Sequence, residues 1–308
     1  MNVALFTHPA ALAHDTGPEH PECPDRMRAV LRALETPEFT PLLRETTPKA
    51  TSAQLKAVHD PAYVDQLFAL PQDQLTAIDG DTIFSPGTLD AALYAAGGAC
   101  AAVDAVFEGW AEAAFVAMRP PGHHAEADRA MGFCFFNNAA IAAAHARARW
   151  NIRRVAVLDF DVHHGNGTQH LFAADPELFY GSSHQSPCFP GTGLASEHGA
   201  AENIVNTPLA PGADGAAFRA AWRETILPAL TRFTPEFIII SAGFDAHAAD
   251  PLAQLRLREA DFTWITQELM AVADTRCKGR IISVLEGGYD LNALAQSAAA
   301  HVRALMRL

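Results

Sequence analysis

The stretch VAVLDFDVHHGNG, residues 155–167, runs without a break from an apolar segment into a cluster of acidic and histidine side chains. Consecutive apolar residues are typical of a strand whose two faces are both covered, as in a parallel sheet flanked by helices. In such sheets, ligands bind beyond the carboxyl ends of the strands. This one stretch therefore predicts both an α/β fold and the edge of the sheet that carries the functional site.

The rest of the chain repeats this pattern, because short apolar runs alternate with Ala-rich helical stretches. The expected strands cover residues 2–6, 113–118, 153–160, 177–183, 236–243 and 280–288, and the expected helices cover 25–35, 87–109, 137–150, 216–233, 259–275 and 291–308. The sequence has no Ser/Gly linker, charge block or internal repeat. We therefore expect one domain over residues 1–308, built as a single open, mostly parallel β-sheet with helices on both faces.

Composition limits the class of partner. The 308 residues carry a formal charge of −13 and include three lysines, which opposes binding to nucleic acid and favours a neutral or cationic substrate. No apolar run approaches the roughly 20 residues of a membrane-spanning helix, so no membrane partner is expected. The five cysteines form no CxxC pair and the N-terminus lacks the basic segment of a signal peptide, which together predict a cytoplasmic protein.

Polar side chains follow four of the expected strands. The segments RPPGHH (119–124), DVHHGNG (161–167), FDAHAADP (244–251) and YD (289–290) each come directly after an apolar run. Because the carboxyl ends of parallel strands meet at the same edge of a sheet, we expect these distant segments to converge on one crevice.

The second of these clusters supplies residues for a metal site. Alternation along an extended strand end would place Asp159, Asp161 and His163 on the same side. Asp161 and His163 are expected to bind the metal, with Asp245 as the third ligand and Asp159 in a supporting or separate cation-binding role. Two carboxylates and one imidazole suit Zn²⁺, and the same donors accommodate Fe²⁺ or Co²⁺. Two neighbouring residues could be ligands or, equally, cap a helix and a turn: His247 and Asp250.

Two adjacent histidines, His123 and His124, follow the Pro-Pro-Gly turn. A metal-activated water needs one group to accept its proton and another to protonate the leaving group, and two imidazoles can divide these tasks. The nearest partners for the histidine pair, judged by cluster, are Asp159 and Asn166.

Other residues near the clusters suit substrate binding. Tyr289 follows two glycines and could donate to a developing oxyanion opposite the metal, although a core position is equally compatible with the sequence. Gly132, Phe133 and Phe189 lie in expected loops, where paired aromatic rings could wall a narrow channel for an alkyl chain.

Together these motifs resemble the histone deacetylase family of the arginase-deacetylase fold, specifically its class II and bacterial deacetylase-like amidohydrolase branch. The resemblance runs through HDTGPEHPECPDR (14–26), RPPGHHA, GFCFFNNAAIAA, DFDVHHGNGTQ, FPGTG, SAGFDAHAADP and LEGGYD, and so covers nearly the whole chain. It implies Zn²⁺ at the three ligands named above, the histidine pair as acid and base, and Tyr289 polarising the amide carbonyl. It also implies an acyl-lysine tunnel lined by the two phenylalanines, with Gly132 at its base.

The resemblance implies finer roles as well. His124 would be the principal base and His123 mainly electrostatic. Asn166 stands where class I enzymes have an aspartate, so His124 should be held less strongly as a cation. Structural K⁺ is implied at a set of side chains and backbone carbonyls: Asp159, Asp161, His163, Ser182 and Ser183.

Two departures from related families narrow the expectation. Arginase-type ureohydrolases carry a further aspartate where this chain has Gly165, which favours a single catalytic metal here. Polyamine-specific relatives place a glutamate after the Asp-Pro of the third cluster, whereas this chain has Leu252, as lysine deacetylases do.

The expected function is therefore a zinc-dependent amidohydrolase that removes an acyl group, above all acetyl, from lysine in peptides or proteins. One alternative is a hydrolase of acetylpolyamines or other small acylamides. The other is a weakly active acyl-lysine binding protein. Tyr289 counts against that last alternative, because weakly active class II relatives carry histidine in its place.

Overall fold

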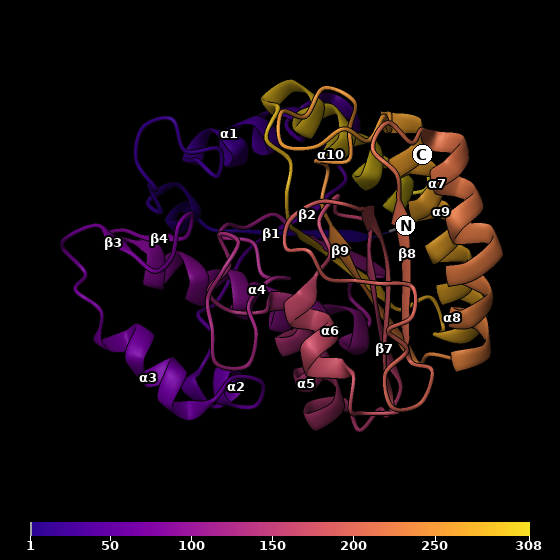
Figure 1. Cartoon of the computed structure of the whole chain (residues 1–308), viewed down its shortest axis with the longest axis horizontal. Helices are drawn as coiled ribbons and strands as arrows, with labels where there is room; N and C mark the ends of the chain where they lie inside the picture. Colours follow the sequence, from indigo (N-terminus) through magenta and orange to yellow (C-terminus); the bar gives the residue numbers. More distant parts are fainter. Residues whose placement is uncertain (1) are drawn as a thin grey trace.

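A computed structural model describes residues 2–308, and this part of the chain forms one eight-stranded sheet in which every neighbouring pair is parallel (Figure 1). The strand order is β2-β1-β5-β10-β9-β6-β7-β8. The strands are β1 (Val3–Thr7), β2 (Leu43–Thr46), β5 (Ala113–Val116), β6 (Val155–Asp159), β7 (Leu178–Gln185), β8 (Ile204–Leu209), β9 (Phe237–Ala242) and β10 (Ile281–Leu285). A separate antiparallel hairpin consists of β3 (Thr76–Ala77) and β4 (Ile83–Phe84). The expected α/β fold is confirmed.

Helices cover both faces of the sheet, because its central strands are apolar on both sides (Figure 1). One face carries α4 (Thr88–Glu108), α5 (Asn138–Trp150) and the short α6 (Asn166–Phe172). The opposite face carries α1 (Pro24–Ala33), α7 (Gly215–Ala221), α8 (Leu227–Phe233), α9 (Glu259–Arg276) and α10 (Leu291–Leu305). Two short helices, α2 (Ser52–Lys56) and α3 (Pro61–Ala69), extend the first layer.

The sequence analysis expected no segment that could span a membrane. Yet by length and composition, helix α4 is apolar enough to cross one. However, 72% of its most apolar window is buried inside the protein. A Cβ atom at Gly97 would lie 2.1 Å from the carbonyl oxygen of Pro48, so the glycine is what allows the helix to pack this closely. The apolar composition of α4 is thus used in the core of this structure.

The sequence expectation missed the two edge strands of the sheet. The residues of β2, LRET, are mostly exposed, and β8, IVNTPL, includes a proline. Pairing with β1 and β7 holds these edge strands, so their own sequences need no buried-strand pattern. Helix α6 was missed because it begins with Asn-Gly, which is typical of a turn. The expected helix over 216–233 forms, with a π-helical turn at Trp222–Ile226.

The loop after β6 requires a correction. The strand ends at Asp159, so strand alternation does not align Asp161 and His163 as the sequence argument assumed. Instead, Asp159 Oδ1 accepts the amide of Asp161 at 3.1 Å, and Asp161 Oδ1 accepts the amide of His163 at 2.9 Å. These successive side-chain-to-backbone bonds fold the loop at the carboxyl edge of the sheet, where β5, β9 and β10 also end.

Candidate active site

Three ligand-type side chains converge at this edge. Asp161, His163 and Asp245 are buried, and one donor atom from each lies within 4.8 Å of the other two. His163 Nδ1 lies 3.1 Å from Asp161 Oδ1 and 3.2 Å from Asp245 Oδ2. The remaining carboxylate oxygens accept backbone amides, from Gly287 at 2.8 Å and from Val162 at 2.8 Å. The backbone therefore fixes both carboxylates in place.

This cluster fits a divalent metal ion. Burial and the adjacent charge of Asp161 raise the pKa of Asp245 to about 7, so the paired carboxylates call for a cation between them. Ligands bound about 2.0–2.1 Å from a tetrahedral ion lie roughly 3.3 Å apart, close to the separations observed here. A Cβ atom at Gly243 would lie 2.0 Å from Asp161, and one at Gly287 would lie 2.0 Å from Asp245. The two glycines thus leave a space that other residues would fill.

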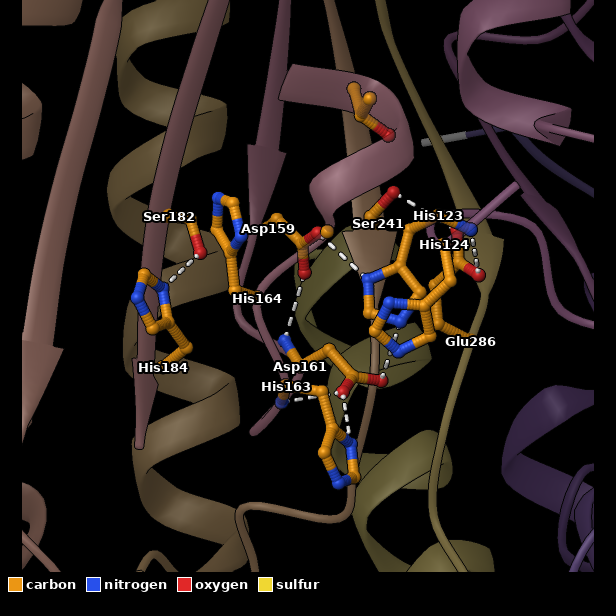
Figure 2. Close-up of polar contacts among 12 residues, drawn as sticks. His123, His124, Asp159, Asp161, His163, His164, Ser182, His184, Ser241 and Glu286 are labelled. Carbon is orange, nitrogen blue, oxygen red and sulfur yellow. Dashed lines mark hydrogen bonds and ion pairs between the residues drawn. The ribbon is translucent and has the colours of Figure 1, made fainter. Parts of the chain in front are cut away.

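The histidine pair lies beside the cluster, with ring centroids 4.0 Å apart (Figure 2). His123 Nδ1 donates to Asp159 Oδ2 at 3.0 Å, and Asn166 Oδ1 accepts from His124 Nδ1 at 2.8 Å. Both predicted partners are present, one on each histidine. The two histidines therefore differ in their partner: a carboxylate for one and a neutral amide for the other.

The pKa values of the two histidines shift in opposite directions. Burial alone would lower the pKa of His123, but the carboxylates of Asp161 and Asp159 outweigh it and raise the pKa to about 10. For His124, burial and the positive charge of His123 hold the pKa well below its usual value. The geometry thus favours a cationic His123 next to a neutral His124, which is free to accept a proton.

A cavity of about 260 Å³ opens onto these groups. Its lining residues come from loops far apart in the sequence: Pro21, Asp81, His124, Gly132, Phe133, His163, Phe189, Leu252 and Tyr289. The four residues predicted to bind substrate are all among them. Phe189 is 41% exposed and Leu252 is 38% exposed, which places both at the mouth. Gly132 has a φ of +56°, and a Cβ atom there would lie 2.5 Å from the His124 ring, so glycine is required at this wall.

Tyr289 borders the cavity rather than the core. Its ring lies 5.8 Å from that of Phe133, and the Arg26 guanidinium carbon lies 4.8 Å from its centroid. Burial raises the pKa of the Tyr289 phenol well above its usual value, so the hydroxyl remains protonated and can donate.

The residues predicted to bind potassium do not all lie on one face of the sheet. Asp159 is the register partner of Ser182, whose hydroxyl lies 2.9 Å from His184 Nδ1. Ser183 instead accepts from the Trp222 indole at 2.9 Å, on the opposite face of β7. The potassium site therefore stays a prediction. The structure also explains why position 165 is a glycine, because a Cβ atom there would lie 2.5 Å from Asp159 Oδ2.

His247 and Asp250, predicted as either ligands or cap and turn residues, take the turn role: His247 Nδ1 accepts the amide of Ala249 at 3.1 Å, and Asp250 Oδ1 accepts that of Leu252 at 3.0 Å. His247 Nε2 lies 3.4 Å from Glu259, and Asp250 accepts the amide of Tyr289 at 2.7 Å. Within residues 2–308, the group of side chains suited to a metal contains neither of them.

Sequence reasoning missed Glu286, which anchors the histidine loop (Figure 2). Its buried carboxylate accepts the amides of Gly122 at 2.7 Å and His123 at 3.1 Å, and the Ser241 hydroxyl at 3.0 Å. A charged residue directly after the apolar run IISVL was the available signal, because a buried acid must find donors.

Glu286→Ala is expected to lower the free energy of unfolding by about 2–4 kcal/mol, because it leaves two buried amides without an acceptor. Urea denaturation of the purified protein measures the change. Glu286→Gln keeps an acceptor oxygen at this position and should lose clearly less stability. Equal losses for the two variants would mean that charge, rather than hydrogen bonding to the loop, is what Glu286 supplies.

Comparison with known proteins identifies the family of the chain. The histone deacetylase domain model matches residues 20–305. An uncharacterized Synechocystis protein, slr0245, is 40% identical over 308 residues, covering 99% of each chain. The histone deacetylase-like amidohydrolase of Pseudomonas aeruginosa is 39% identical, covering 88% of this chain and 73% of the relative. The solved HDA15 HD domain superimposes with a TM-score of 0.94 at 34% identity, covering 99% of this chain and 88% of that one. The chain therefore belongs to the histone deacetylase family and has its arginase-deacetylase fold.

Proposed function

We propose that this member of the family is a zinc-dependent deacetylase that removes an acyl group, above all acetyl, from the ε-amine of lysine in peptides or proteins. One observation carries the proposal: a single cavity is bordered by His163, a predicted metal ligand, by His124, whose pKa is lowered, by Tyr289, whose pKa is raised, and by two phenylalanines. Its two phenylalanines suit the alkyl chain of lysine, and its polar lining includes His163, one of the predicted metal ligands.

The residues of the chain would act in sequence on the amide. Phe133 and Phe189 hold the alkyl chain, and the Tyr289 hydroxyl donates to the carbonyl oxygen as negative charge develops there. His124 accepts a proton as water adds to the carbonyl carbon, and returns it to the nitrogen as the carbon–nitrogen bond breaks, releasing the amine and the carboxylic acid. His123, paired with Asp159, supplies positive charge nearby. When bound by the ligand cluster, Zn²⁺ would polarise the carbonyl and make water more acidic.

The test is turnover on two substrates under one set of conditions. The zinc-reconstituted protein is assayed for kcat/KM on an acetyl-lysine peptide and on an N-acetylated polyamine. A clear peptide preference supports the proposal. A polyamine preference would show that the rim of the cavity, rather than Leu252, sets specificity, and absence of turnover on both would favour the acyl-lysine binding alternative.

Leu252→Glu tests the mouth of the cavity. A carboxylate at this half-exposed position would attract the distant ammonium group of a polyamine, but solvent screens the interaction. We expect the ratio of polyamine to peptide kcat/KM to rise by about fivefold to tenfold, which corresponds to about 1 kcal/mol. Leu252→Gln is the matched uncharged control and should leave the ratio near that of the unmodified protein. If the two variants change the ratio equally, then shape at the mouth matters and charge does not.

A further inference from the structure

A carboxylate from another loop holds the main chain of Tyr289. Asp250 Oδ2 accepts the amide of Tyr289 at 2.7 Å and that of Asp290 at 3.4 Å, while Oδ1 accepts the amide of Leu252 at 3.0 Å. Asp250 itself is 8% exposed, so water competes little for these bonds. One buried side chain thus joins the loop after β9 to the loop after β10.

Contacts from other elements hold the loop that carries Tyr289. Gly287 and Gly288 precede the tyrosine, and Gly288 has a φ of +127°, a conformation that residues with a side chain rarely adopt. On one side, Arg26 Nε donates to the carbonyl of Gly288 at 2.6 Å and its guanidinium lies against the Tyr289 ring. Arg26 therefore restrains the residue before the tyrosine and the ring, whereas Asp250 restrains the amide of the tyrosine itself.

We propose that Asp250 is a positioning residue that fixes Tyr289 at the depth where its hydroxyl faces the substrate carbonyl. Because the same carboxylate also binds the Leu252 amide, it fixes the position of Leu252, at the mouth of the cavity, relative to Tyr289. This inference rests on the proposed function, since it assigns Tyr289 the hydrogen bond to the amide.

The need for an aspartate follows from the count of acceptors. A carboxylate offers two acceptor oxygens to the three backbone amides, whereas an asparagine offers one and turns an N–H donor toward the other amides. Asp250→Asn is therefore close to isosteric but must release either Leu252 or the Tyr289 loop. Asp214→Asn is a matched control, because Asp214 also accepts two backbone amides, those of Ala216 and Ala217, at an exposed helix start.

Fluorine NMR of protein labelled with 3-fluorotyrosine reports on Tyr289 independently of turnover. The chain has four tyrosines, and Tyr289→Phe identifies the signal of this one. Asp250→Asn is expected to shift or broaden the Tyr289 signal and leave the other three unchanged, and Asp214→Asn should move none. An unmoved Tyr289 signal, or equal movement of all four, overturns the proposal.

Activity gives a second readout. Asp250→Asn is expected to lower kcat on the acetyl-lysine peptide by about 10-fold to 100-fold, with KM changed much less, because a misplaced group costs transition-state stabilisation. In the Tyr289→Phe background the same substitution should have little further effect, and a full additional loss would contradict a role through Tyr289. If the unmodified protein has no peptide turnover, the proposed function fails while the NMR result still decides the position of Tyr289.

Amide hydrogen exchange of the unmodified protein tests the proposal without any variant. The Tyr289 amide, bound to a buried carboxylate, is expected to exchange slowly. Exchange at the rate of an open loop would overturn the proposal even if Asp250→Asn could not be purified.

Discussion

Asp245→Asn is expected to lower kcat on an acetyl-lysine peptide on the order of 10³-fold or more and to remove most of the bound metal. Asp245 Oδ2 faces His163 Nδ1 at 3.2 Å, and Oδ1 accepts the amide of Val162 at 2.8 Å. An asparagine keeps the size and can still accept from Val162, but it removes one of the two negative charges that would bind the cation. Elemental analysis of the purified protein, together with steady-state kinetics, measures both effects.

Asp250→Asn is the matched control, because it changes the same atoms in the same loop at a residue outside the ligand cluster. It should retain the metal while Asp245→Asn loses it. An Asp245→Asn protein with full metal content and turnover would remove Asp245 from the ligand set. Metal loss in Asp250→Asn would instead reinstate Asp250 as a ligand.

Removal of the metal from the unmodified protein tests the identity of the ion. Chelation is expected to abolish turnover, and added Zn²⁺ should restore it. Two carboxylates and one imidazole also accept Fe²⁺ and Co²⁺, so these ions should restore turnover as well. Failure of every divalent ion to restore a folded, chelated protein would contradict a metal-dependent reaction.

Contiguous motifs made much of this site predictable. Asp161 and His163 follow a buried strand within a few residues, and parallel topology alone brings Asp245 and the histidine pair to the same edge. Even so, the reason given for the alignment of Asp161 was wrong, since the loop is folded by hydrogen bonds from carboxylates to backbone amides.

Contacts to the backbone explain what the sequence could not show. The position of Glu286 after an apolar run indicates that it needs donors, but its donors and those of Asp250 include distant main-chain amides, which have no residue identity that a sequence pattern could reveal. Asp81 reaches the cavity from the loop between β3 and β4, whose position depends on packing over long sequence distances. The edge strand β8 was missed for a related reason, because its partner β7, rather than its own sequence, determines that it is a strand.

His124→Ala is expected to lower kcat by about 10²–10⁴-fold, the range that a positioned acid–base group supplies. Of the two histidines, His124 lines the cavity that the described residues form, and its partner is a neutral amide. Asn166 also donates to the His124 carbonyl at 3.3 Å and to Glu126 at 2.7 Å, so the surrounding loop keeps bonds when the imidazole is removed. Peptide turnover measures the loss, and an unchanged unfolding transition shows that the fold is retained.

Asn166→Asp separates proton transfer by His124 from simple packing. The substitution keeps the size and the acceptor oxygen 2.8 Å from His124 Nδ1 and adds a negative charge. Because it also replaces the donor that faces Glu126 with an oxygen, it is made in a Glu126→Gln background, with Glu126→Gln alone as the control. A carboxylate partner raises the pKa of a histidine, so a larger fraction of His124 is protonated at a given pH and unable to accept a proton. The acidic limb of kcat/KM against pH should therefore move to higher pH, with activity retained above it. An unmoved limb would mean that another group accepts the proton, and the loss in His124→Ala would then reflect the missing contact with Phe189, whose ring lies 5.1 Å away.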